Sequence, residues 1–112
     1  MNLSPHPMTL RQLQYVVAVA DRKSFRAAAE DCHVAQPSLS AQIAQVEEAL
    51  GVRIFERDRR KVVLTSAGTA VVARARALLL AADELQESAR QLSDPLSGRL
   101  RIGVIPTVGP YL

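Results

Sequence analysis

The sequence is poor in the residues that several classes of protein require. Cys32 is the only cysteine among 112 residues, which excludes an internal disulfide and a zinc site built on several cysteines. Aromatic residues make up 4% and tryptophan is absent, which argues against a protein that stacks bases of single strands. No apolar run approaches the ~20 residues of a membrane span, and residues 1–7, taken as a flexible lead, do not resemble a signal peptide. We expect one compact domain with an appendage, located in the cytoplasm.

Residues for catalysis or metal binding are equally scarce. His6 and His33 are too few and too scattered for a metal site. Asp31, Cys32 and His33 are consecutive, so they cannot all converge on one substrate. Free cysteine is among the most often buried residue types, and Cys32 is therefore interpreted as structural. We therefore expect that the protein is not an enzyme and that it binds no cofactor and no metal.

Positive charge is concentrated in one short segment. The formal net charge is +3, and residues 53–61 alone carry five basic against two acidic residues. Such a run is often only a solvated loop, although it also suits an anionic partner. The elements that precede it decide between the two.

Apolar spacing and capping residues predict two helices before this segment. Thr9 and Gln12 fit a capping box, and apolar residues then recur at helical spacing over residues 9–21. Ser24 is a suitable N-cap for a second helix that begins at Phe25.

A third helix is predicted from the first-turn Pro37 to a glycine stop at Gly51. Its apolar stripe comprises Leu39, Ile43, Val46 and Leu50. Its opposite face carries the uncharged hydrogen-bonding residues Gln36, Ser38, Gln42 and Gln45.

A basic hairpin and a long helix are predicted next. Residues 52–57 and 61–65 read as two short strands around the turn 58–60, and we call residues 52–65 the wing. Thr65 resembles an N-cap for a helix over residues 66–92.

The long helix has a strict heptad repeat, with spacings of four and three. Its apolar positions are Val71, Ala75, Leu78, Ala82, Leu85, Ala89 and Leu92. Such a repeat is typical of a coiled-coil seam, so we predict that this linker helix dimerises. Docking of the helix on its own domain is the alternative.

The remaining residues are interpreted as part of a further domain. Residues 93–98 have the composition of a hinge, and residues 99–112 open with a strand pattern. A lone strand is not stable, so we expect a fragment of a longer protein, with 99–112 as the first strand of a truncated effector domain.

The predicted order of elements is typical of a winged helix-turn-helix: a helix, a short turn, a second helix and a basic hairpin. We therefore predict a mainly α fold, with the winged helix-turn-helix over residues 8–65. A helix of this type fits the major groove of B-DNA, where glutamine and serine reach base edges and basic residues contact phosphates. The predicted recognition residues are Gln36, Pro37, Ser38, Ser40, Ala41, Gln42 and Gln45, among which Ser38 and Gln42 are expected to read bases. The predicted phosphate contacts are Arg22, Lys23, Arg26, Arg57, Arg59, Arg60 and Lys61.

The sequence resembles the N-terminal domain of the LysR-type transcriptional regulators. Four linked segments carry the resemblance: residues 24–29 (Ser-Phe-Arg-Ala-Ala-Ala), 34–43 (Val-Ala-Gln-Pro-Ser-Leu-Ser-Ala-Gln-Ile), 47–57 (Glu-Glu-Ala-Leu-Gly-Val-Arg-Ile-Phe-Glu-Arg) and 64–68 (Leu-Thr-Ser-Ala-Gly). Two positions depart from it. Many members have serine where this chain has Ala35, and many have arginine at Ala41.

Residues 31–34, 60–62 and 102–112 are similar to the peroxide-sensing OxyR subfamily. The resemblance implies a regulator that binds an interrupted palindromic operator in double-stranded DNA. It also implies a homodimer through the linker helix, and a tetramer in the full-length protein. The redox cysteines of that subfamily belong to the effector domain, so no peroxide chemistry is expected within these 112 residues.

Two other functions stay open at this point. One is a protein-interaction or dimerisation module on a winged-helix scaffold, which would show no salt-dependent DNA binding. The other is a LysR-type regulator that senses a small-molecule inducer rather than peroxide.

Overall fold

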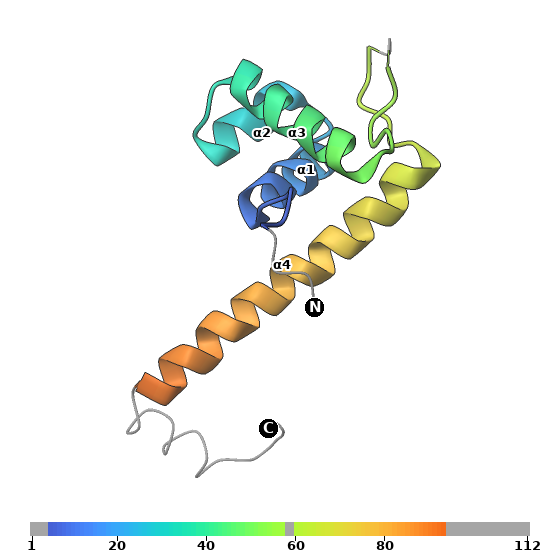
Figure 1. The fold of residues 1–112 in the computed structure, drawn as a ribbon. Coiled ribbons are helices and arrows are strands. Elements are labelled where there is room, and N and C mark those ends of the chain that lie inside the picture. The colour runs from blue at the N-terminus through green and yellow to red at the C-terminus, as the bar shows by residue number, and fades with distance from the viewer. Residues whose placement is uncertain (1–4, 58–59, 94–112) are drawn as a thin grey trace. The chain divides into compact units, whose positions relative to one another are not determined.

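Four helices make up most of the part of the chain that the computed structural model describes, residues 5–57 and 60–93. The helices are α1 (Leu10–Arg22), α2 (Phe25–Cys32), α3 (Gln36–Leu50) and α4 (Ser66–Ser93) (Figure 1). The chain divides into two compact units, Met1–Leu79 and Leu80–Leu112. The first unit holds α1 to α3, the wing and the beginning of α4.

The first two helices begin at the predicted caps. The Thr9 hydroxyl accepts from the Gln12 N–H (3.1 Å), and the Gln12 side-chain oxygen accepts from the Thr9 N–H (3.0 Å), which confirms the capping box. The Ser24 hydroxyl accepts from the Ala27 N–H at 3.0 Å. Helix α1 continues to Arg22, one residue beyond the predicted end.

The other two helices also follow the local sequence. Ala35 precedes α3 without a side-chain cap, whereas Gly51 ends this helix in the left-handed region (φ 71°). The Thr65 hydroxyl accepts from the Gly68 N–H (2.8 Å), as expected of an N-cap. Ser93, predicted to open the hinge, is the last residue of α4. The rest of the hinge and the predicted strand over 99–112 lie outside the described residues.

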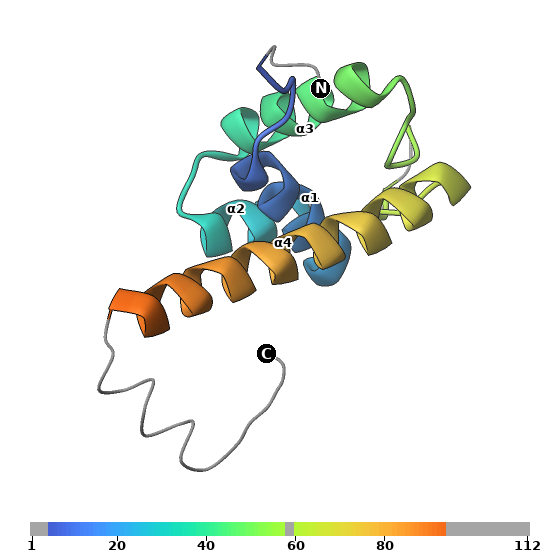
Figure 2. The same ribbon diagram turned by 60° about the horizontal axis from the view of Figure 1, so that its bottom comes forward.

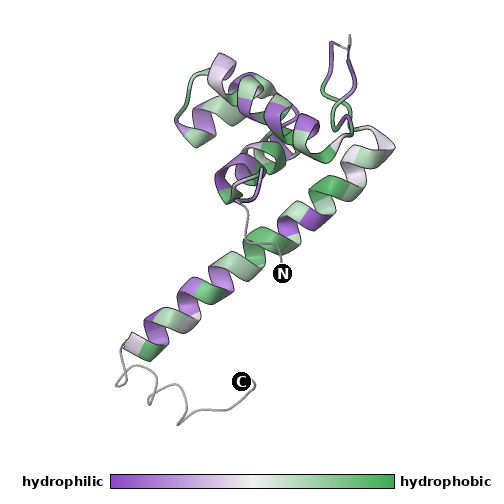
Figure 3. Ribbon diagram, viewed as in Figure 1, coloured by the Kyte–Doolittle hydropathy of each residue, from purple (hydrophilic) through white to green (hydrophobic). Residues whose placement is uncertain are grey.

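The core lies where α1, α2 and α3 contact one another (Figure 2). Three of the four predicted stripe residues of α3 are buried in it, namely Leu39, Ile43 and Val46. Leu50, the fourth residue of the stripe, is 38% exposed because it is the last residue of α3, and it lines an apolar surface groove with Met8 and Leu78. Polar residues occupy the outer faces of the same helices, as the alternation of purple and green in Figure 3 shows.

The beginning of α4 belongs to the same core. Val72 is buried in the main hydrophobic cluster, and Ala75 is only 1% exposed. Within the first unit, the beginning of α4 therefore packs on its own domain. Leu78, three residues further on, is exposed.

An ion pair between Asp21 of α1 and Arg76 of α4 adds a small pH-dependent term. The hydrogen bond from Arg76 holds the pKa of the Asp21 carboxyl below its usual 3.8. A carboxyl whose pKa is lower in the folded state stabilises the fold above its unfolded pKa, and this stabilisation is lost as the pH falls through the folded pKa. Both side chains are about half exposed, so the pair contributes less than about 1 kcal/mol.

We predict that Asp21→Asn lowers the free energy of unfolding by less than about 1 kcal/mol at neutral pH, and by a smaller amount at a pH below 3.8, where the carboxyl begins to be protonated in the unfolded chain. Urea unfolding at the two pH values measures this difference, with Asp83→Asn as an exposed acidic control. An equal loss at both pH values would show that charge pairing is not the cause.

The wing differs from its prediction. No strand forms in the part of the chain that the structure describes, and the two arms meet at one isolated antiparallel bridge between Phe55 and Leu64. The Glu56 N–H donates to the Val63 carbonyl at 2.8 Å beside this bridge. Residues 58 and 59 of the predicted turn lie outside the described ranges.

The hydrogen bonds of the first arm explain why a two-stranded wing does not extend further. The N–H groups of Ile54 and Phe55 donate to the Glu47 carboxylate of α3, at 2.7 and 3.3 Å, and not across the hairpin. An isolated two-stranded ribbon is marginal in water. The wing is therefore held by the Glu47 side chain together with the few backbone bonds beside the Phe55–Leu64 bridge.

Candidate nucleic-acid interface

The predicted recognition residues lie on an open face of α3. Six of them are exposed and Gln42 is half-buried; the exposed ones are Gln36, Pro37, Ser38, Ser40, Ala41 and Gln45. The first turn of this helix carries no acidic residue. A face of neutral hydrogen-bonding groups at a helix N-terminus can approach a polyanion without repulsion.

Two of these residues are tied to α1. The Gln12 amide nitrogen donates to the side-chain oxygens of Gln42 (2.8 Å) and Gln45 (3.2 Å). The sequence predicted Gln12 only as half of a capping box. Its contact with α3 was missed because the two segments are thirty residues apart and no local pattern joins them.

Four of the predicted phosphate contacts gather around one hollow of about 350 Å³, which we call the basic hollow. It is lined by Lys23, Ser24, Phe25, Arg26, Gln36, Phe55, Glu56, Arg60, Lys61 and Val62. The hollow thus joins the beginnings of α2 and α3 to both arms of the wing. Cations from both elements and the first recognition residue, Gln36, share one surface.

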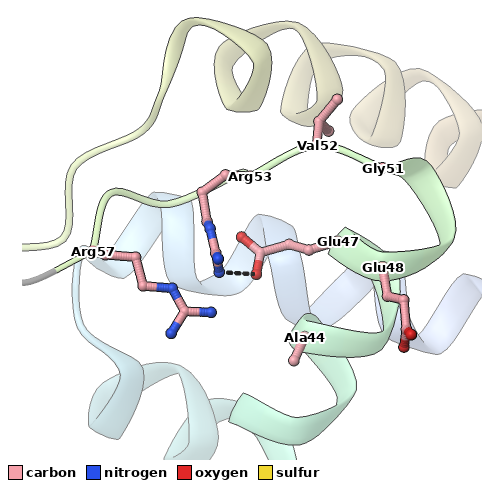
Figure 4. Close-up of a pocket in the computed structure, with 7 residues that line it drawn as sticks. All are labelled: Ala44, Glu47, Glu48, Gly51, Val52, Arg53 and Arg57. Atoms are coloured by element: carbon pink, nitrogen blue, oxygen red, sulfur yellow. Dashed lines mark hydrogen bonds and ion pairs between the residues drawn. The ribbon is translucent and has the colours of Figure 1, made fainter.

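Two of the other predicted phosphate contacts, Arg22 and Arg57, do not line this hollow. Arg22 forms an ion pair with Asp31 at 2.6 Å, which commits its charge to the contact between α1 and α2. Arg57 lines a different hollow with Arg53, at the end of α3 (Figure 4). Arg59 lies outside the described residues.

A carboxylate of α3 positions the wing. Beyond its bonds to two backbone N–H groups of the first arm, Glu47 accepts from the Arg53 guanidinium at 3.4 Å, the contact drawn as a dashed line in Figure 4. The adjacent Glu48 points away from this contact in the same view. Phe25 supports the wing from α2, because its ring meets that of Phe55 edge to face at 5.6 Å. Sequence reasoning did not assign Glu47 a role.

Cys32 has the surroundings of a structural residue. Its side chain is half-buried and packs against the hydrophobic cluster. Burial raises the pKa of the thiol, and the neighbouring Asp31 carboxylate raises it further. A raised pKa disfavours the reactive thiolate.

The described residues contain no group of three histidine, cysteine or acidic side chains placed to hold a metal. Among the helices that the structure describes, none has the length and apolar character to cross a bilayer.

The predicted dimerisation positions fall into two groups. Ala75 lies in the chain's own core, whereas Val71 packs against that core and is half-buried. In the first unit Leu78 is exposed, and in the second unit Leu85 and Leu92 are exposed. Ala82 is half-buried and Ala89 exposed; both belong to the second unit.

Comparisons with known proteins agree on the family. The model of the family described as "Bacterial regulatory helix-turn-helix protein, lysR family" matches residues 10–69. A hydrogen peroxide-inducible genes activator of Pectobacterium carotovorum subsp. carotovorum is 50% identical over 105 residues, which cover 94% of this chain and 35% of that protein. The chain thus spans about a third of the length of the curated relatives it matches.

Two solved structures are similar as well. Full-length OxyR C199D from Pseudomonas aeruginosa has a TM-score of 0.72 and 44% identity, over 74% of this chain and 28% of that one. The BenM DBD in complex with benA site 1 DNA has a TM-score of 0.75 and 38% identity, over 78% and 98%. The predicted resemblance to LysR-type regulators, and to OxyR among them, is confirmed. The chain belongs to the lysR family of bacterial regulatory helix-turn-helix proteins.

Proposed function

We propose that this chain binds double-stranded DNA sequence-specifically, as the N-terminal part of an OxyR-like transcriptional regulator in the bacterial cytoplasm. The basic hollow carries the proposal, because Lys23, Arg26, Arg60 and Lys61 line it together with Gln36, the first residue of α3. The α3 face would enter the major groove, and the cations around the hollow would contact the adjacent phosphates. The similarity to the BenM DBD, which was solved in complex with benA site 1 DNA, supports DNA binding by this chain.

Salt dependence tests this proposal. If Arg60 neutralises a phosphate, Arg60→Ala lowers affinity for every duplex and reduces the slope of log affinity against log salt by about one unit. Fluorescence anisotropy of a labelled duplex at several salt concentrations measures this slope. Arg74→Ala is a matched control, because it removes an equal charge from α4 at a surface groove that no wing residue lines.

The outcome separates DNA binding from the protein-interaction function. Equal slopes for Arg60→Ala and Arg74→Ala would show that the basic hollow does not contact DNA phosphates. Wild-type protein with no salt-dependent affinity would contradict the proposed function itself.

We further propose that the protein acts as a homodimer through α4, and as a tetramer at full length. The exposed leucines of α4 support this, because large apolar side chains left in solvent are typical of a surface that another chain covers. Two copies of α3 would then reach successive major grooves of an interrupted palindrome, about 34–36 Å apart. The name of the relative at 50% identity supports peroxide as the signal of the whole protein.

A further inference from the structure

Gln12 is a buried polar residue with two roles. It is 6% exposed, two of its side-chain hydrogen bonds reach Gln42 and Gln45 of α3, and another closes the capping box of α1. Its oxygen accepts from the Thr9 backbone N–H at 3.0 Å, while its nitrogen donates to Gln42 at 2.8 Å and to Gln45 at 3.2 Å. The capping box of α1 and two predicted recognition residues therefore belong to one hydrogen-bond chain.

In this chain of hydrogen bonds, the order of donors and acceptors is fixed at the Thr9 end. A backbone N–H can only donate, so the side chain of Gln12 must turn its oxygen toward Thr9 and its NH₂ group toward α3. The groups that meet this NH₂ must be acceptors, which requires Gln42 and Gln45 to present their oxygens. A helix cap thus sets the orientation of both amides on the DNA-facing helix.

The orientation leaves one kind of group available on Gln42. Its oxygen is engaged with α1, whereas its NH₂ group has no hydrogen-bond partner in the described part of the chain. The major groove offers acceptors to such a donor at N7 and O6 of guanine, N7 of adenine and O4 of thymine. The bidentate contact of glutamine with adenine also needs the amide oxygen, and that oxygen is held toward Gln12.

We propose that Gln12 is a positioning residue that sets the base preference of Gln42, so that Gln42 reads bases through its NH₂ donor. This inference rests on the proposed function, in which the face of α3 enters the major groove. It specifies the chemistry of that contact: acceptor edges, with guanine and thymine favoured over cytosine, whose major-groove edge is a donor.

Gln12→Glu tests the proposal because it changes only the α3-facing end of the hydrogen-bond chain. A glutamate oxygen still accepts from the Thr9 N–H, so the capping box persists. The carboxylate has no N–H to donate, and the Gln42 amide must turn over to donate to it. Gln42 then presents its oxygen to the groove, which suits adenine N6 and cytosine N4.

The experiment uses the full chain and a pool of randomised duplexes, from which the wild type selects a preferred site. Gln42→Ala identifies the base pair that Gln42 reads, because the variant loses its preference among the four bases at that position of the site. At that position, we expect Gln12→Glu to change the affinity ratio of acceptor to donor bases about tenfold in favour of donor bases. Ratios between duplexes are compared because the added negative charge lowers every affinity alike.

Thr9→Ala serves as the matched control. It removes the hydroxyl that caps α1 but keeps the backbone N–H that orients Gln12, so it lowers thermal stability without changing base preference. Circular dichroism confirms folding of each variant. The side-chain NH₂ resonances of Gln42 give a reading without DNA, since they shift when that group gains a carboxylate partner in Gln12→Glu.

The outcomes distinguish this inference from the function on which it rests. An unchanged base ranking in folded Gln12→Glu overturns the positioning role. The positioning role is also overturned if the wild type selects a DNA site but Gln42→Ala changes the base preference at none of its positions. In that case the proposed DNA binding stands. A wild type that selects no site overturns the proposed function together with the inference.

Discussion

Gly68→Ala is expected to destabilise the first compact unit by about 3 kcal/mol or more. In an open helix the same change stabilises by about 1 kcal/mol, because alanine is the better helix former. Here a Cβ on Gly68 would lie 2.0 Å from the carbonyl oxygen of Ile54 and 2.8 Å from its carbon. Both are backbone atoms and cannot move aside as a flexible side chain would.

This clash would disrupt the contact between α4 and the wing. The Ile54 carbonyl accepts from the Thr65 N–H at 3.0 Å, so its displacement breaks one of the bonds that close the wing. Urea unfolding followed by circular dichroism measures the loss, and Ser66→Ala, at the exposed start of the same helix, is the control. A stable Gly68→Ala protein would mean that α4 does not pack closely on the wing.

Glu47→Ala is expected to cost about 2–3 kcal/mol of unfolding free energy and to lower DNA affinity. The change leaves the N–H groups of Ile54 and Phe55 without their acceptor, and both residues are buried. Removal of a negative charge alone would strengthen binding to a polyanion. A fall in affinity would therefore report a displaced wing rather than an altered charge.

Glu48→Ala separates the two effects. It removes the same charge one residue further along α3, where the side chain points away from the wing (Figure 4). We expect nearly unchanged stability and unchanged or slightly higher affinity. Glu47→Gln keeps one acceptor oxygen and should fall between Glu47→Ala and the wild type. Similar results for Glu47→Ala and Glu48→Ala, in unfolding and in anisotropy, would contradict the anchoring role.

The sequence predicted the helix ends well because their causes are local. Thr9, Ser24 and Thr65 each accept from an N–H three residues ahead, a contact that depends on little beyond the immediate sequence. The left-handed Gly51 is a local signal of the same kind. These positions set the boundaries of every element that carries the candidate interface.

Features that depend on tertiary packing could not be predicted in this way. The wing pairs less than expected because Glu47 accepts from two N–H groups of its first arm, and the ion pair of Arg22 with Asp31 was not foreseen. Ala75 fits the heptad seam in sequence but lies in the chain's own core, since a heptad repeat cannot tell an internal partner from an external one. In each case the partner is distant in sequence and its identity is known only once the helices are packed.

Amide chemical-shift mapping tests the central claim most directly. The chain, labelled with ¹⁵N, is titrated with a duplex that it selects from a random pool, at low salt. We predict that the largest changes fall at residues 24–26, 36–42 and 60–61, which border the basic hollow and the face of α3. Unchanged signals there, with shifts confined to the apolar groove of Met8, Leu50 and Leu78, would contradict the account.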